Sequence, residues 1–261
     1  MTAEDFRFHP PDVPATPALR WVLARAYAAR DTELAEIEGS AAVSLAKKLS
    51  LAARIASVQP PARLAGELGG PAAAELKQLR ALAVAQEMRL GAALAAVDVA
   101  AADLRIPYAP LKGQALVLGG FAPDGGRPSS DLDLLVPELK LDSLQKELLR
   151  REFVVVGEGY EHQAAALRHE AGGMVELHRV LPGVRLAPRR SAHFEDLLAA
   201  GLLGPPASST AFRPKGDLRL PRREILTAHA LVHAIAQHGL APAVFPGFLF
   251  FGDLLDLAFR D

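Results

Sequence analysis

The fold is decided by one stretch, Ser130-Asp131-Leu132-Asp133-Leu134-Leu135-Val136. Its alternating pattern is typical of a β-strand, in which residues two apart point to the same face. We therefore expect Asp131 and Asp133 to project together, and Leu132 and Leu134 to face the core. Two carboxylates so close resist joint ionisation unless a cation shares them, and Mg²⁺ is a hard cation that carboxylates bind. The alternative is a strand end with two solvated acids.

A candidate phosphate-binding turn precedes this strand in Pro110-Leu111-Lys112-Gly113-Gln114-Ala115-Leu116. The pattern indicates a strand that turns through Gly113 into a helix. Glycine lets the backbone come close to a ligand, and free N–H groups at a helix start attract anions. Lys112 adds a positive charge suited to a triphosphate. The alternative is an ordinary strand-to-helix turn.

A third acid follows the strand, in Met174-Val175-Glu176-Leu177-His178-Arg179. Glu176 and His178 are expected on one face of a strand, opposite Val175 and Leu177. If this strand neighbours the Asp131 strand, Glu176 completes a three-carboxylate cluster of the kind that holds two metals and a triphosphate. His178 could orient a carboxylate, act as a base or be structural. Glu176 could instead be a surface acid.

These segments together resemble a known family. Lys112-Gly113, the run from Arg127 to Val136, and Val175-Glu176-Leu177-His178 are similar to a poorly characterised bacterial nucleotidyltransferase family. Its pattern runs Leu-Lys-Gly, Arg-x-x-Ser-Asp-hydrophobic-Asp, Val-Glu-Leu-His, and it belongs to the polymerase-β-like nucleotidyltransferase superfamily. The resemblance covers residues 107–180 closely and extends more weakly into the helices around 231–257.

The resemblance implies a nucleotidyltransferase that depends on Mg²⁺ or Mn²⁺ and uses a nucleoside triphosphate. Its catalytic residues and metal ligands would be Asp131, Asp133 and Glu176. Binding of the nucleotide would involve Lys112, Gly113, Gln114, Arg127, Ser130 and His178. Gln114 stands where the wider superfamily has serine, and the spacer from Gly113 to Asp131 is longer than usual there; both features match the smaller family. Arg127 could alternatively only solvate the preceding Gly-Gly turn.

The composition of the chain excludes several other classes of function and of binding site. The net charge of −1 gives no basic field, so we expect no strong non-specific DNA binding. The absence of cysteine excludes disulfides, thiolate zinc sites and cysteine nucleophiles, and is compatible with a cytoplasmic location. No window has the apolar length that spans a membrane, and no P-loop or Gly-x-Ser-x-Gly motif occurs. His229 and His233 have zinc-like spacing but lack a third ligand, which favours packing or exposure.

The predicted fold class is α+β, with a mixed β-sheet core of the nucleotidyltransferase fold between helical regions. We assign residues 1–104 to a helical N-terminal region, 105–186 to the core and 187–261 to a mostly helical C-terminal region. A long helix is expected from Pro71, and Ala171-Gly172-Gly173 is expected to turn a hairpin. Strands are predicted near 107–111, 131–136, 152–157, 163–169 and 174–180, and helices near 113–120, 140–150, 192–200, after Pro221 and from Phe245. The apolar face of the long helix is predicted to comprise Leu76, Leu79, Leu82, Met88, Leu90, Leu94 and Val97.

The acceptor of the nucleotide stays open among a small molecule, an RNA 3′ end and a protein side chain. Two other functions compete with nucleotidyl transfer. The same core could act as a kinase-like phosphotransferase, or it could be a catalytically inactive nucleotide-binding or scaffold protein.

Overall fold

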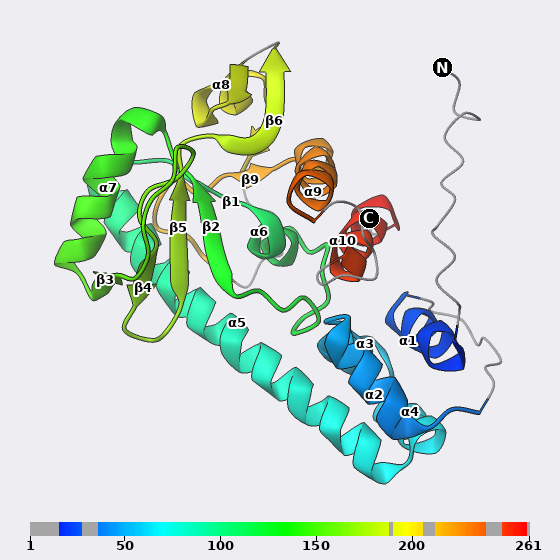
Figure 1. Cartoon of the computed structure of the whole chain (residues 1–261). Coiled ribbons are helices and arrows are strands. Elements are labelled where there is room, and N and C mark those ends of the chain that lie inside the picture. The colour runs from blue at the N-terminus through cyan, green and yellow to red at the C-terminus, as the bar shows by residue number, and fades with distance from the viewer. Residues whose placement is uncertain (1–15, 28–35, 188–189, 206–211, 239–246, 260–261) are drawn as a thin grey trace, which may run out of the picture.

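The computed structural model describes residues 16–27, 36–187, 190–205, 212–238 and 247–259. Helices and strands are mixed along the chain, as an α+β fold requires (Figure 1). The helices are α1 (Pro17–Tyr27), α2 (Gly39–Lys48), α3 (Ala52–Val58), α4 (Pro61–Leu68), α5 (Gly70–Leu104), α6 (Lys112–Leu118), α7 (Glu138–Arg150), α8 (Phe194–Ala199), α9 (Arg223–His238) and α10 (Gly247–Phe259). The strands are β1 (Ala109–Pro110), β2 (Asp131–Leu135), β3 (Phe153–Val155), β4 (Leu167–His169), β5 (Met174–His178), β6 (Leu181–Ala187), β7 (Arg190–Ala192), β8 (Leu203–Gly204) and β9 (Leu220–Pro221).

The main sheet places the two acidic strands side by side. Its order within the described residues is β1-β2-β5-β4-β3, with β2 and β5 parallel and the other pairs antiparallel. The register sets Asp133 opposite Glu176. Gly172, with φ of 92°, turns β4 into β5, so the predicted hairpin is confirmed.

One face of β2 and β5 is core and the other carries the polar residues. Leu132, Leu134, Val175 and Leu177 are fully buried against α5 and α7, as the alternating pattern predicts. Asp131, Asp133, Glu176 and His178 therefore project from the opposite face, toward α6, α9 and α10.

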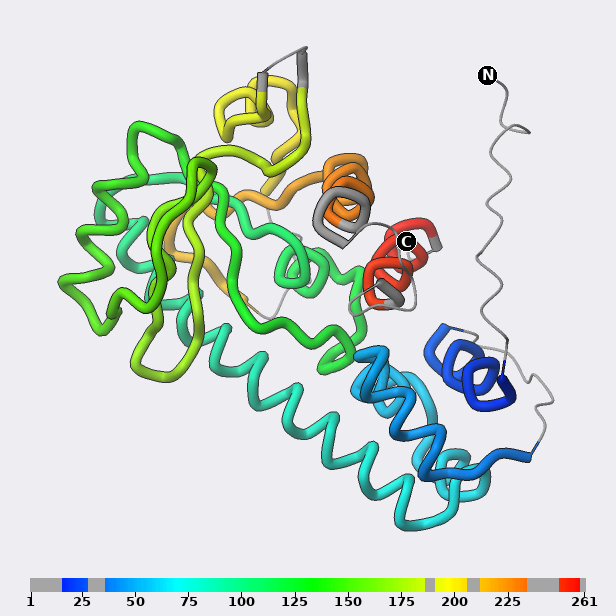
Figure 2. Tube along the Cα trace, in the orientation of Figure 1, coloured from blue at the N-terminus to red at the C-terminus, as the bar shows by residue number. Residues whose placement is uncertain are grey.

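Helix α5 connects two hydrophobic cores. In Figures 1 and 2 it runs from the bundle of α1 to α4 to the underside of the sheet. Leu76 packs in the bundle, whereas Leu90, Leu94 and Val97 pack under the sheet. The predicted apolar face is wrong at Leu82 and Met88, which are 60% and 71% exposed. These two lie between the cores, where neither layer covers the helix.

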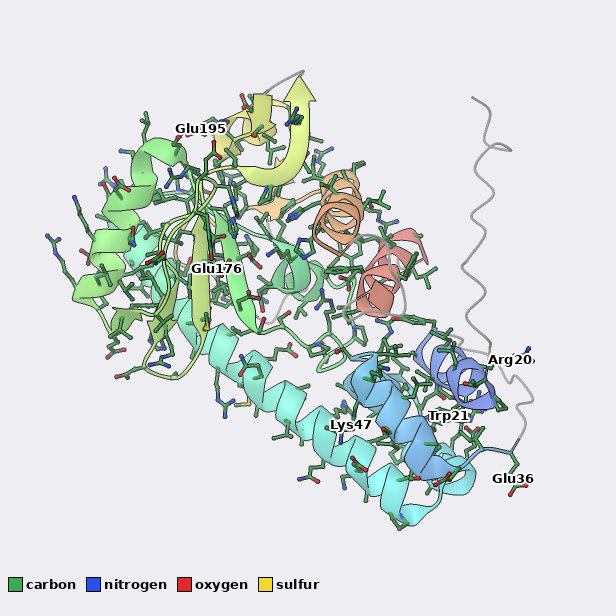
Figure 3. All side chains as sticks on the ribbon, in the orientation of Figure 1. Arg20, Trp21, Glu36, Lys47, Glu176 and Glu195 are labelled. Carbon is green, nitrogen blue, oxygen red and sulfur yellow. The ribbon has the colours of Figure 1, made fainter. Side chains whose placement is uncertain are left out.

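The N-terminal bundle is closed by a polar contact inside its apolar packing. Trp21 points from α1 into the bundle (Figure 3), and its indole donates a 2.8 Å hydrogen bond to Glu67. Arg25 contacts the other oxygen of Glu67 at 2.7 Å. The half-buried Glu67 carboxylate thus links α1 to α4.

Several predicted boundaries were wrong. The strand predicted at 163–169 is confined to Leu167–His169, and the region after 187 contains β7, β8 and β9 as well as helices. Short strands form there because Leu181 and Ala192 pair across the β6–β7 hairpin and pack with Phe194. The helices after Pro221 and near the end of the chain are confirmed.

The domain boundary between residues 104 and 105 stays a prediction. None of the helices within the described ranges has both the length and the apolar character needed to cross a bilayer.

Candidate functional site

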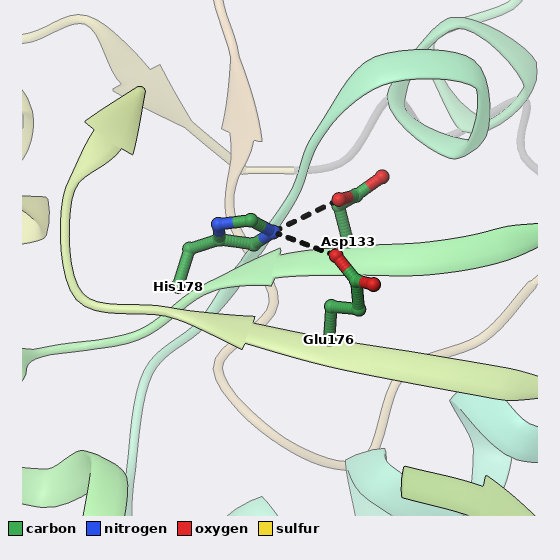
Figure 4. Close-up of side chains that lie close together, drawn as sticks. All are labelled: Asp133, Glu176 and His178. Atoms are coloured by element: carbon green, nitrogen blue, oxygen red, sulfur yellow. Dashed lines mark hydrogen bonds and ion pairs between the residues drawn. The ribbon is translucent and has the colours of Figure 1, made fainter. Parts of the chain in front are cut away.

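The centre of the site is a group of three side chains on β2 and β5. Asp133, Glu176 and His178 each offer one ligand atom, and these atoms lie within 4.8 Å of one another. His178 Nε2 is 2.9 Å from Asp133 Oδ1 and 3.7 Å from Glu176 Oε2 (Figure 4). The two carboxylates are ligands that suit Mg²⁺ and Mn²⁺, whereas an imidazole is a ligand typical of transition metals. The group forms because the parallel register sets Asp133 beside Glu176 and the two-residue repeat adds His178.

Asp131 lies on the same strand face but outside this group. Its Oδ1 is 3.1 Å from the Ser130 hydroxyl. Burial, and then the charge of Asp133, raise the pKa of Asp131. The sequence thus predicted Asp131, Asp133 and Glu176 as ligands, whereas the structure brings His178 into the group in place of Asp131. The assignment of Asp131 as a ligand stays a prediction.

Lys112 neutralises Asp133 directly. Its Nζ lies 2.7 Å from Asp133 Oδ1, the oxygen that also contacts His178. Lys112 has a φ of 49°, a left-handed conformation that non-glycine residues rarely adopt. The Leu111 amide donates to the Asp133 carbonyl at 2.8 Å and holds this turn against β2. Backbone strain therefore accompanies the placement of an ammonium on the buried acid.

The charges of the group shift one another. Burial alone would raise the pKa of Asp133, but hydrogen bonds and charge from His178 and Lys112 hold it well below its usual range. Burial, followed by repulsion from Asp133 and Asp131, raises the pKa of Glu176. Burial opposes the charge of Lys112, yet Asp133 keeps the pKa of this ammonium raised. Asp133 is thus the fixed anion of the site.

Arg127 is buried in an ion pair rather than solvating a turn. Its Nε and one terminal nitrogen donate to the two oxygens of Asp253 on α10, at 2.6 and 2.8 Å. Only 7% of the Arg127 side chain and 4% of the Asp253 side chain are exposed. Sequence reasoning missed Asp253. The available signal was two acids, Asp253 and Asp256, inside the otherwise apolar run from Phe248 to Leu257, which a helix buries only with partners.

Gly113 is required by the loop that passes over it. A Cβ at this position would overlap the Ser129 hydroxyl and press on the Arg127 guanidinium. The loop of residues 127–130 therefore lies directly on the start of α6. Gln114, predicted to bind nucleotide, is buried on α6 outside the residues that line the cleft.

A cleft of about 520 Å³ opens beside the group of Asp133, Glu176 and His178, and Asp133 is part of its wall. Its polar wall contains Lys112, Gly113, Asp131 and Asp133 together with the loop of residues 127–130. The facing wall comes from distant segments: Ser50, His233, Leu249 and Phe250. A volume of this size accommodates a small organic ligand.

Helix α9 carries two histidines near the cleft, and His233 is one of its lining residues. The rings of His229 and His233 are 6.1 Å apart and edge-on, and neither belongs to a metal-binding group among the described residues. His229 is 2% exposed, and its pKa is lowered to about 3 by burial and by nearby Lys112.

Comparison with known proteins gives one match. A family model described as an uncharacterised nucleotidyltransferase matches residues 35–257. No curated protein and no solved structure matches the chain. The matched range contains the acidic group and every residue that lines the cleft.

Proposed function

Because this chain belongs to the uncharacterised nucleotidyltransferase family, we propose that it moves a nucleoside monophosphate from a nucleoside triphosphate to an acceptor hydroxyl. The observation that carries this proposal is the position of Asp133, Glu176 and His178 next to the 520 Å³ cleft. A cation-binding group that borders an open, polar cleft suits a substrate with a charged phosphate chain.

The residues divide into those that hold a metal and those that place the phosphates. Asp133, Glu176 and His178 would hold Mg²⁺ or Mn²⁺, and Asp131 is proposed as a further carboxylate ligand from the same strand face. The metal would supply charge neutralisation for the triphosphate and for the pyrophosphate that leaves.

Lys112 and Gly113 are proposed to lie along the phosphate chain. The Lys112 ammonium is in the cleft wall, and Gly113 lines the same cleft beneath the loop of residues 127–130. Ser130 offers a hydroxyl next to Asp131. Arg127 adds positive potential to the cleft wall, although two of its N–H groups already donate hydrogen bonds to Asp253. His178 orients Asp133 through Oδ1.

The acceptor stays unidentified among small molecules, RNA 3′ ends and protein side chains. Neither wall of the cleft is a basic groove, which supports the expectation of no strong non-specific DNA binding. The cytoplasmic location is likewise a proposal, supported by the lack of cysteine.

Labelled triphosphates test the reaction class. The chain would be incubated with each triphosphate, carrying label on the α- or γ-phosphate, with Mg²⁺ or Mn²⁺ and fractionated acceptors. Transfer of the α-label with release of pyrophosphate is expected. Transfer of the γ-label would instead show a kinase-like phosphotransferase.

Two variants make this test specific. Asp133→Asn should abolish transfer, whereas Asp142→Asn, which neutralises an exposed acid on α7, should leave it unchanged. Triphosphate binding without turnover, equal in the wild type and Asp133→Asn, would favour an inactive nucleotide-binding protein.

A further inference from the structure

One buried histidine near the site has no partner for its outer ring nitrogen. Among the described residues, no hydrogen bond reaches His229 Nε2, although this atom is buried. Burial of an unpaired polar atom is unfavourable, so its retention calls for an explanation. The residue lies near Lys112, since both line one small pocket.

The second observation is that Lys112 occupies a position that a metal ion needs. Asp133 Oδ1 already contacts the Lys112 ammonium at 2.7 Å and the His178 ring at 2.9 Å. A divalent cation binds a carboxylate oxygen at about 2.0–2.1 Å. An ammonium and a divalent cation on the same oxygen would repel each other strongly. A metal ion that binds Asp133 Oδ1 therefore competes with the Lys112 ammonium for this oxygen.

The third observation is a small space between Lys112 and His229. A pocket of about 20 Å³ has both residues on its wall, together with Arg127, His233 and Asp253. A volume above about 10–15 Å³ holds one water molecule, and an ammonium group is of similar size. Both oxygens of Asp253 already accept from the Arg127 guanidinium, which neutralises the charge of this carboxylate.

We propose that His229 is a positioning residue for Lys112: its Nε2 accepts a hydrogen bond from the Lys112 ammonium when a divalent cation binds Asp133 Oδ1. This inference rests on the proposed metal-dependent function. The neutral state of the buried His229 ring supports it, because a neutral imidazole has one nitrogen that accepts. Lys112 then has two partners, Asp133 before metal binding and His229 after it. Lys112 lines both the small pocket and the cleft, so the two spaces meet at this residue.

The test measures Mn²⁺ affinity of the full chain by calorimetry, without turnover. His229→Leu should weaken Mn²⁺ binding about tenfold, because the displaced ammonium loses a charge-assisted hydrogen bond. His229→Gln, whose amide oxygen accepts, should restore most of the affinity. His169→Leu, a matched change at another buried histidine on β4, should leave it unaltered.

A double variant distinguishes the proposed positioning of Lys112 by His229 from a general loss of structure. Lys112→Met should tighten Mn²⁺ binding by removing the competing cation, and adding His229→Leu to it should have no further effect. Nitrogen NMR of the histidine rings gives a second readout. The His229 Nε2 signal should shift on addition of Mg²⁺ in the wild type but not in Lys112→Met.

The outcomes distinguish this inference from the function it rests on. Unchanged Mn²⁺ affinity in His229→Leu, or an equal loss in the Lys112→Met background, overturns the role of His229 and leaves the metal site standing. Absence of Mn²⁺ binding by the wild type, with and without a non-hydrolysable triphosphate, overturns both.

Discussion

Replacing Asp253 by alanine tests whether α10 anchors the loop of residues 127–130. The change leaves the Arg127 guanidinium, 7% exposed, without the two charge-assisted hydrogen bonds of 2.6 and 2.8 Å. Removing one partner of a buried ion pair typically costs about 3–5 kcal/mol, because the other charge stays desolvated. Arg127 keeps its 2.8 Å bond to the Pro128 carbonyl, so the lower part of that range is expected. Equilibrium urea unfolding at pH 7 measures the loss.

Two controls define what the measurement means. Glu75→Ala breaks the exposed pair with Lys47, whose side chains are 45% and 51% exposed, and should cost less than about 1 kcal/mol. The double variant Arg127→Met with Asp253→Leu removes both charges and should recover much of the lost stability. A loss below about 1 kcal/mol in Asp253→Ala would refute the reasoning, since the pair would then not be holding a desolvated arginine.

Four further predictions follow from contacts described above. Glu176→Gln should stabilise the metal-free protein at pH values above 4.5, the ordinary pKa of this carboxyl group, because the folded state raises the pKa of Glu176 and opposes its ionisation. The same change should abolish the rise in Tm that we expect Mn²⁺ to cause in the wild type. Wild-type stability should fall as pH drops from 6.5 toward about 3, since the unfolded chain protonates His229 while the folded chain resists; thermal melts of His229→Gln should lack this component. Lys112→Gly should be more stable than Lys112→Ala by about 1 kcal/mol in urea unfolding, because glycine relieves the φ of 49°, and equal stabilities would deny that strain. Asp98→Ala should cost about 3 kcal/mol by the same assay, because this buried carboxylate accepts from the Tyr108 hydroxyl and two loop amides, and a near-neutral result would show that the loop rearranges.

The acidic strands could be predicted because their information is local. Alternation in residues 131–136 and 174–178 fixes which side chains share a face, and the structure confirms buried Leu132 and Val175 opposite the acids. The proximity of Glu176 to Asp133 depended on strand order, which the family resemblance implied and the register confirms. The sequence could not show that His178 lies against Asp133, because this contact depends on the rotation of the imidazole ring and on the position of its nitrogen.

The other parts of the site depend on contacts between distant segments. Arg127 finds Asp253 126 residues later, and no local pattern links them. The placement of Lys112 on Asp133 follows from a left-handed backbone at a non-glycine residue, which sequence patterns do not favour. Leu82 and Met88 continue the helical apolar pattern of α5, yet periodicity cannot show that the helix changes partners between two cores.

The two buried pairs of α10 also set an order of events during protein synthesis. Arg54 pairs with Asp256 at 2.6 Å across 202 residues, and Arg127 pairs with Asp253 across 126. At about 5–20 residues per second, the ribosome reaches Asp256 about 10–40 s after Arg54. Until α10 has been made, burial of either arginine would leave its charge without a counter-ion, which opposes the docking of α3 and of the loop at Arg127. The cleft is therefore completed only when α10 docks, and the growing chain cannot close it earlier.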